Sequence, residues 1–185
     1  MAGRLSFEDE ISRNKAKSFI LMLIIFFFII GLGMLISLVV NQDLFFHFTI
    51  FATIFSLVYI WAGYYFSDKI ALASVNAKPA DKIKHRMLFH SIENMSIASG
   101  LPMPKVYVME SKEINAFASG RNPENAVICV TSGALEKLNK EELEGVIAHE
   151  MSHIANLDIR FMTLTAVLVG MLSIIAQMFL RSLWY

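Results

Sequence analysis

The chain has 185 residues, of which 56% are hydrophobic and only 17% are charged, and its formal net charge at neutral pH is zero. Soluble domains are nearer to half apolar and a quarter charged, so this composition argues against a soluble protein and favours a membrane protein. The polar middle of the chain has no basic stripe with interleaved aromatic residues, which argues against a nucleic-acid partner.

Two uncharged segments near the N-terminus predict a transmembrane helical hairpin over residues 18–66. The first, 18–40, is long enough to cross the roughly 30 Å hydrocarbon core as a helix. A cleaved signal peptide would have an apolar region of only about 7–15 residues, followed by a small-residue cleavage site, and the sequence has neither. The second segment, 44–66, follows after the polar residues Asn41, Gln42 and Asp43, which leaves room only for a tight turn.

A third apolar segment, 161–180, lies between Arg160 and Arg181 and predicts a third transmembrane helix within residues 160–185. The basic residues set the expected orientation, because cytoplasmic segments carry an excess of Lys and Arg. The hairpin turn has none. We therefore expect the N-terminal segment 1–17 and the polar domain 67–159 to face the cytoplasm. The basic residues before the first span and after the second are Arg4, Arg13, Lys15, Lys17, Lys69, Lys78, Lys82, Lys84 and Arg86.

The polar domain has the pattern of a small mixed α/β unit. Residues 81–99 predict a helix that ends before Gly100, with its apolar positions spaced near 3.6 residues from Ile83 onward. Alternating residues in 105–109 predict a strand, and the runs 114–119 and 126–131 predict a hairpin, joined by a turn-rich loop. The lone Cys129 lies in one of these runs, so no internal disulfide and no oxidising compartment are indicated.

The next predicted helix carries the chemistry. Asn139 can cap its N-terminus, with Glu142 three residues later in a capping-box arrangement. The same helix continues through Ala148-His149-Glu150-Met151-Ser152-His153, which contains the H-E-x-x-H pattern.

Residues four apart on a helix share a face, so both imidazoles of this pattern can bind one Zn²⁺ ion at about 2.0–2.1 Å. Glu150 lies about 100° around the helix from His149, where its carboxylate can take a proton from water activated by the metal. Zinc lowers the pKa of such water towards about 7, which makes hydroxide available for attack on a peptide carbonyl. We therefore predict a zinc site at His149 and His153 with Glu150 as the general base.

The bare pattern also occurs by chance, on the order of once in a few hundred chains of this length. The alternative interpretation is a pair of surface histidines on an ordinary helix beside a membrane. The capped helix and its apolar rear face favour the metal site.

With these residues, the sequence resembles the HtpX-type membrane metallopeptidases, which are related to the CAAX prenyl proteases. The resemblance also covers the order of parts: a hairpin of spans, a cytoplasmic domain, a zinc helix and a further span directly after it. Essentially the whole chain resembles the first portion of such a protein. The residues that carry the resemblance are Ala148, His149, Glu150, Ser152, His153, Ile154, Asn156 and Asp158, with the stretch 115–120.

The resemblance implies a fold, a role for each motif and a place in the cell. The fold class is an α+β membrane protein with a zincin-like domain, in which a short sheet packs near the zinc helix. The activity is that of a zinc endopeptidase of the bacterial inner membrane, which acts in quality control on membrane or unfolded polypeptides. Asp158 has a supporting role beside the zinc helix. An extended substrate is expected to add as a strand to the edge formed by Asn115, Ala116, Phe117 and Ala118.

From the residues alone, that strand could equally be one that merely packs in the sheet, and Asp158 could be a solvated charge at a helix end. The two motifs leave a second function open, a non-catalytic membrane protein that serves assembly or regulation. A small transporter is disfavoured, because the spans contain no buried charge pair and no broken helix.

The sequence departs from the family pattern at the third zinc ligand. A catalytic zinc normally has three protein ligands, which in this family include a Glu on a later helix. After Glu150, Asp158 is the only acidic residue and there is no histidine beyond His153. Leu157 replaces a common family Gly and favours a continued helix, on which Asp158 would face roughly 140–180° away from the ligands. We therefore expect a chain that is the front part of a longer enzyme, binds zinc weakly and has little activity by itself.

Overall fold

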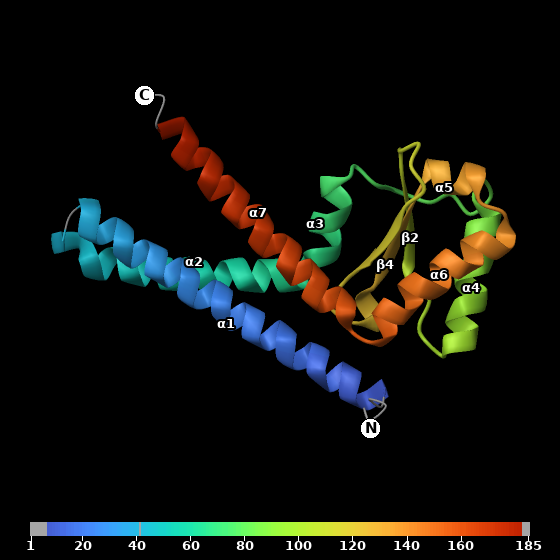
Figure 1. The fold of residues 1–185 in the computed structure, drawn as a ribbon, viewed down its shortest axis with the longest axis horizontal. Coiled ribbons are helices and arrows are strands. Elements are labelled where there is room, and N and C mark those ends of the chain that lie inside the picture. Colours follow the sequence, from blue (N-terminus) through green and yellow to red (C-terminus); the bar gives the residue numbers. More distant parts are fainter. Residues whose placement is uncertain (1–6, 41, 183–185) are drawn as a thin grey trace, which may run out of the picture.

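The computed structural model describes residues 7–40 and 42–182, which form two long N-terminal helices, a small sheet covered by helices and a final long helix (Figure 1). Helix α1 covers Phe7–Val40, a short 3-10 turn η1 covers Gln42–Leu44, and α2 covers Phe45–Tyr65. Helices α1 and α2 pack along each other, which confirms the predicted helical hairpin.

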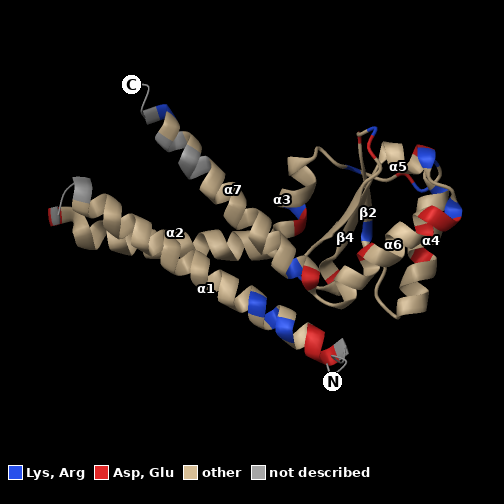
Figure 2. Cartoon of the chain, viewed as in Figure 1, with Lys and Arg blue, Asp and Glu red and all other residues tan. Residues whose placement is uncertain are grey.

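Two helices of the described residues are long and apolar enough to cross a membrane, over Glu8–Leu38 and Phe45–Tyr65. A third candidate arises when α6 (Lys140–Ala155) and the first part of α7 (Asp158–Ser182) are counted as one bent span. Figure 2 shows charged residues gathered on the sheet domain and at the start of α1, while most of α1, α2 and α7 is without charge.

Helix α7 packs against both helices of the hairpin. Ile25 and Ile29 of α1 are buried in one cluster with Met171 of α7, and Tyr59 of α2 lies beside them. The Tyr59 hydroxyl donates a hydrogen bond of 2.9 Å to the carbonyl oxygen of Val167. The three apolar helices thus form one packed unit.

The sheet has four strands in the order β1-β2-β4-β3, where β1 is Lys78–Pro79, β2 is Lys105–Met109, β3 is Ala116–Ser119 and β4 is Val127–Thr131. Strands β2 and β4 are parallel, and the other two pairs are antiparallel. The predicted strand 105–109 and the predicted hairpin are confirmed, although β3 and β4 begin two residues and one residue later than expected. Strand β3 lies at an edge of the sheet.

Helices cover both faces of the sheet. Helix α4 (Arg86–Ser99) and α6 pack on one face, where the fully buried Ile92, Ile128 and Ile147 belong to the main core. Helix α3 (Ser67–Ser74) covers the other face near Cys129, whose pKa is raised to about 11 by burial. Every residue of β4 is buried, because this strand is central and covered on both sides.

Three local predictions need correction. The helix expected over 81–99 begins at Arg86, because the Asp81 carboxylate accepts hydrogen bonds from the N–H groups of Ile83 and Lys84 and holds a turn there. Ile83 is accordingly 84% exposed and does not belong to a buried stripe. Helices α3 and α5 (Ser132–Lys137) and the two-residue strand β1 were not predicted, since they are too short to show a period.

Helix α6, the predicted zinc helix, ends earlier than expected. The predicted capping box of Asn139 and Glu142 is present at its start. Helix α6 then ends at Ala155, and α7 begins at Asp158 after a bend of 86°. The continued helix expected at Leu157 is therefore wrong: this residue has a φ of 59°, a left-handed conformation that ends a helix. Its side chain is buried at this corner.

Candidate metal centre

Helix α6 brings the two predicted zinc ligands together. The Nε2 atoms of His149 and His153 lie 3.2 Å apart, one turn apart on the same face. Two zinc–nitrogen bonds of about 2.0–2.1 Å at a tetrahedral angle would place the nitrogens about 3.3 Å apart. The pair therefore fits a zinc ion without rearrangement of the helix. The described residues, 7–40 and 42–182, include no group of three or more His, Cys, Asp or Glu side chains that could hold a metal ion.

Glu150 faces the edge of the sheet. Its Oε2 atom accepts a hydrogen bond of 2.8 Å from the backbone N–H of Ala118 in β3. Burial raises the pKa of Glu150 above its ordinary value, while the Ala118 N–H group and the charges of His153 and His149 act in the opposite direction. The carboxylate is thus held at a fixed position and made more basic than an exposed glutamate.

The bend between α6 and α7 turns Asp158 back towards the zinc helix. Its Oδ2 atom lies 3.2 Å from Nδ1 of His153. This contact is made to the nitrogen that does not face His149, so it leaves Nε2 of His153 available to a metal. A carboxylate in this position can fix the tautomer and orientation of a ligating histidine. We expected Asp158 to face away from the predicted ligands. It does not, because the helix ends before Leu157 and the chain turns Asp158 back towards His153.

The residues expected to bind substrate lie along or beside β3. Ala118 lies next to Glu150, and Ala116 pairs with Val130 of the neighbouring strand. Phe117 packs on the opposite face of the sheet, in the cluster that contains Cys129. Asn115 precedes the strand, where its N–H group donates to the Thr131 hydroxyl and its side-chain oxygen accepts from the N–H of Ala116.

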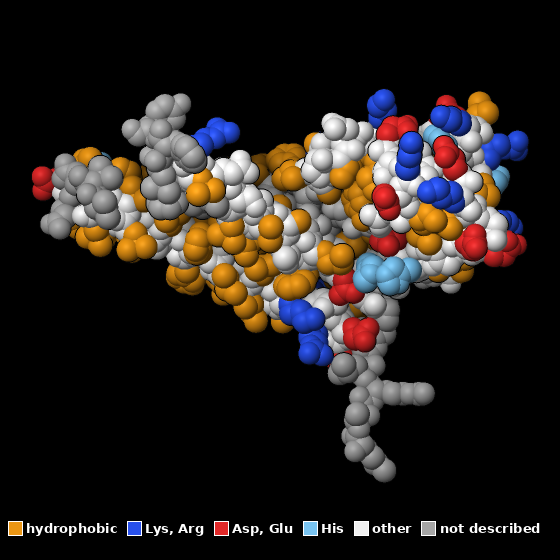
Figure 3. All heavy atoms as spheres, turned by 45° about the horizontal axis from the view of Figure 1, so that its top comes forward, with side chains coloured by type: hydrophobic (Ala, Val, Ile, Leu, Met, Phe, Trp, Pro, Cys, Tyr) orange, Lys and Arg blue, Asp and Glu red, His pale blue; other side chains and the backbone are white. Residues whose placement is uncertain are grey.

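One residue that reaches this site is not marked by any motif in the sequence. Asn14 of α1 is only 7% exposed, and its side-chain N–H group donates to the carboxylate Oδ1 of Asp158 and, at 3.0 Å, to the carbonyl oxygen of Asn156. No local pattern marks Asn14, because its partners are more than 140 residues away in the sequence. Figure 3 shows histidine and acidic side chains close together on the surface between the apolar helices and the charged domain.

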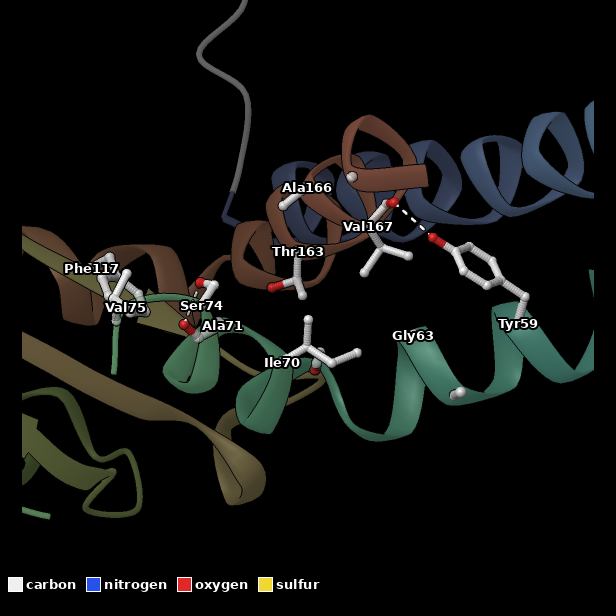
Figure 4. Close-up of a pocket in the computed structure, with 13 residues that line it drawn as sticks. Tyr59, Gly63, Ile70, Ala71, Ser74, Val75, Phe117, Thr163, Ala166 and Val167 are labelled. Atoms are coloured by element: carbon white, nitrogen blue, oxygen red, sulfur yellow. Dashed lines mark hydrogen bonds between the residues drawn. The ribbon is translucent and has the colours of Figure 1, made fainter. Parts of the chain in front are cut away.

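A large apolar cavity lies elsewhere. It has a volume of about 640 Å³ and opens between α2, α3 and α7, where Gly63, Ile70 and Val167 face one another (Figure 4). Phe117 reaches it from β3. None of His149, Glu150 or His153 lines it, so the volume of a cavity does not identify the candidate site here.

Comparisons with known proteins show which family the chain resembles. The chain is 52% identical over 136 residues to a protease HtpX homolog of Caldanaerobacter subterraneus, a match that covers 74% of the chain and 46% of that protein. It is 40% identical over 173 residues to a protease HtpX homolog of Tropheryma whipplei (94% and 58% covered). It is 36% identical over 177 residues to one of Streptococcus uberis (96% and 59% covered).

The chain spans about half the length of the curated relatives it matches. The family model for peptidase family M48 matches residues 82–183, which is more than half of the chain and includes helix α6 and the corner after it. The chain therefore belongs to peptidase family M48, with the HtpX-like membrane metalloproteases among its relatives.

Proposed function

We propose that this chain is the membrane-anchored part of a zinc endopeptidase, in which His149 and His153 bind the metal and Glu150 is the general base. One observation carries the proposal: two imidazole nitrogens lie at the spacing of zinc ligands on a capped helix, with a partly buried carboxylate beside them. Bound zinc would supply a Lewis acid that polarises a peptide carbonyl and activates water. Family membership supports the same chemistry.

Each residue of the proposed site has a separate role. The Nε2 atoms of the two histidines, 3.2 Å apart, would hold the metal, and Asp158 would orient His153 through Nδ1. The N–H group of Ala118 keeps the Glu150 carboxylate at the edge of β3. The raised pKa of Glu150 suits a group that accepts a proton from water and then gives it to the leaving amine.

The substrate in this proposal is an extended polypeptide that adds to the edge strand β3. Strand β3 pairs with β4 on one side only, and its other side faces Glu150. Backbone hydrogen bonds to such an edge hold a chain extended, with its carbonyl groups close to the zinc helix. Membrane or unfolded proteins are the substrates that fit this mode, in a role in membrane protein quality control.

The proposed arrangement in the membrane follows from the apolar helices and the basic residues. Helices α1 and α2 cross the bilayer as a hairpin, and the apolar part of α7 crosses it as a third span. The sheet domain and the start of α1 then face the cytoplasm, where their Lys and Arg residues are concentrated (Figure 2).

The first experiment measures zinc binding by the purified chain in detergent, in competition with a chelating indicator. We expect one weak site that is lost in His149→Ala and in His153→Ala but kept in Glu150→Gln. As a matched control, His90→Ala removes an exposed histidine of α4 and should leave zinc affinity unchanged. Zinc binding that is equal in all four variants would contradict the proposed site.

The second experiment measures cleavage of an unfolded polypeptide by the chain and by a fusion that adds the C-terminal part of the Caldanaerobacter relative. We expect little cleavage by the chain alone and measurable cleavage by the fusion. In the fusion, Glu150→Gln should reduce cleavage by at least about 100-fold, since a general base typically contributes that much or more, while zinc remains bound. Zinc-loaded fusions that never cleave would instead favour the non-catalytic membrane protein.

A further inference from the structure

We infer that Asn14 of α1 is a positioning residue for the metal centre, because it holds the carboxylate of Asp158 against His153. This inference rests on the proposed function and adds a residue from the first membrane helix to the site. No part of the H-E-x-x-H pattern indicates it, because Asn14 lies 135 positions before His149 in the printed sequence.

The contacts of Asn14 form a continuous chain of hydrogen bonds. Its side-chain N–H group donates to Asp158 Oδ1, while Asp158 Oδ2 lies 3.2 Å from Nδ1 of His153. The two oxygens of one carboxylate are thus used on opposite sides, one by the amide and one by the imidazole. With Nδ1–H donating to this carboxylate, Nε2 of His153 presents a lone pair to the metal.

The orientation of the Asn14 amide is itself fixed. The ammonium group of Lys17, one turn further along α1, donates to Oδ1 of Asn14 at 3.3 Å. The amide nitrogen is thereby directed away from Lys17 and towards the α6–α7 corner, where it also donates to the carbonyl oxygen of Asn156. The Asn14 amide thus has three partners, the ammonium group of Lys17, the carbonyl oxygen of Asn156 and the carboxylate of Asp158. A side chain that merely joined two helices would not need all three.

Burial makes this contact consequential. Asn14 is 7% exposed and the Asp158 side chain is 32% exposed, so water can replace a lost amide donor only from the exposed side of the carboxylate. Without it, the Asp158 carboxylate is free to rotate, and His153 loses the partner that selects its tautomer. Outer partners of a metal ligand typically change metal affinity by about 10–100-fold, and Asn14 acts one bond further out. We therefore expect a change of about 3–10-fold.

The test compares Asn14→Leu and Asn14→Asp with the unmodified chain. Both variants keep the size of the side chain and remove the N–H donor, so the second remains usable if the first does not fold. Ser18→Ala is the matched control: Ser18 is also buried on the same helix, but its hydroxyl donates to the backbone carbonyl oxygen of Asn14 and not to the α6–α7 corner. Circular dichroism and gel filtration check that each variant is folded.

The first readout is the ¹⁵N spectrum of the histidine rings without metal, at a pH where the imidazoles are neutral. In the unmodified chain and in Ser18→Ala, we expect His153 to carry its proton on Nδ1. In both Asn14 variants, we expect a mixture of the two tautomers. A His153 spectrum that is the same in all four proteins would overturn the inference, whatever the protein does with zinc.

The second readout is zinc affinity in a double-mutant cycle with Asp158→Ala. We expect Asn14→Leu to weaken zinc binding about 3–10-fold in the unmodified chain and to have no further effect in Asp158→Ala. An equal loss in both backgrounds would show a general structural effect and would also overturn the inference. Zinc binding that does not depend on His149 would contradict the proposed function instead, and the tautomer spectra would still decide the role of Asn14.

Discussion

At the scale of single residues, the burial of the Glu150 carboxylate opposes the stability of the fold at neutral pH. The carboxylate is partly buried, and the hydrogen bond that it accepts from the N–H group of Ala118 does not fully replace water. Its pKa is therefore higher in the folded chain than the ordinary value of 4.5. A raised acid pKa means that the folded state binds the proton more tightly than the unfolded state. Stability from this group is present below pH 4.5 and is lost as the pH rises through the folded-state pKa.

Glu150→Gln should consequently be more stable than the unmodified chain at pH 7. The amide has the same shape, can still accept from Ala118 and carries no charge to desolvate. We expect a higher midpoint of thermal denaturation at pH 7 in metal-free detergent solution, and a gap that closes as the pH falls below 4.5. Glu136→Gln, which removes an exposed carboxylate, is the control for the loss of one negative charge. A gap that widens at low pH would show that the assigned direction of the pKa is wrong.

The residues that sequence reasoning identified at this site are those fixed by local geometry. His149 and His153 face each other because four residues make about one helical turn, whatever the rest of the fold does. Asn14 and the contact of Asp158 with His153 depend on how α1 packs against the α6–α7 corner. Such a contact has no sequence period and cannot be read from a single chain.

At the scale of elements, the α6–α7 corner determines where Asp158 lies. The corner depends on Leu157, whose positive φ is unfavourable for a residue with a branched side chain, although its side chain is buried. Reasoning from helix propensity alone favours a continued helix, because leucine is a good helix former. The hydrogen bond from Asn14 to the Asn156 carbonyl and the burial of Leu157 outweigh that preference.

Substitution at Leu157 separates the steric cost of its positive φ from the packing of its side chain. Leu157→Ala and Leu157→Gly lose the same packing, but only glycine adopts a positive φ without steric cost. We expect the Gly variant to be more stable than the Ala variant by about 1 kcal/mol, measured by denaturant unfolding in detergent. At the neighbouring Ala155, which is helical, the replacement Ala155→Gly should instead destabilise by about 0.5–1 kcal/mol. Equal stabilities of the two Leu157 variants would show that the left-handed turn is not present in solution.

Among the other elements too, those that depend on local sequence signals could be predicted, and those that depend on contacts between distant segments could not. The hairpin of β3 and β4, strand β2 and the capped zinc helix could be predicted, since alternation, turn residues and the capping box are local signals. The parallel pairing of β2 with β4 and the covering of the sheet by α3 could not, because they depend on tertiary packing.

At the scale of the whole molecule, the proposed orientation can be tested by labelling single cysteines from outside intact bacterial cells. The natural Cys129 is fully buried, and its pKa of about 11 keeps the thiol protonated, so it should contribute little background. We expect a membrane-impermeant maleimide to label Asp43→Cys, at the hairpin turn, but not Glu93→Cys, on the exposed face of α4. Both should react after the cells are permeabilised. The reverse pattern would place the sheet domain outside the cytoplasm.

The bend of 86° between α6 and α7 also bears on how far the two histidines lie from the lipid surface. In the proposed arrangement, with α7 upright in the bilayer, α6 would run almost parallel to the lipid surface, so its two imidazoles would lie at about the same depth. A polypeptide in free solution would seldom come that close to the lipid surface. On the proposed function, a polypeptide that is tethered to lipid or partly withdrawn from it reaches that depth, so we expect cleavage near the point where such a chain leaves the bilayer.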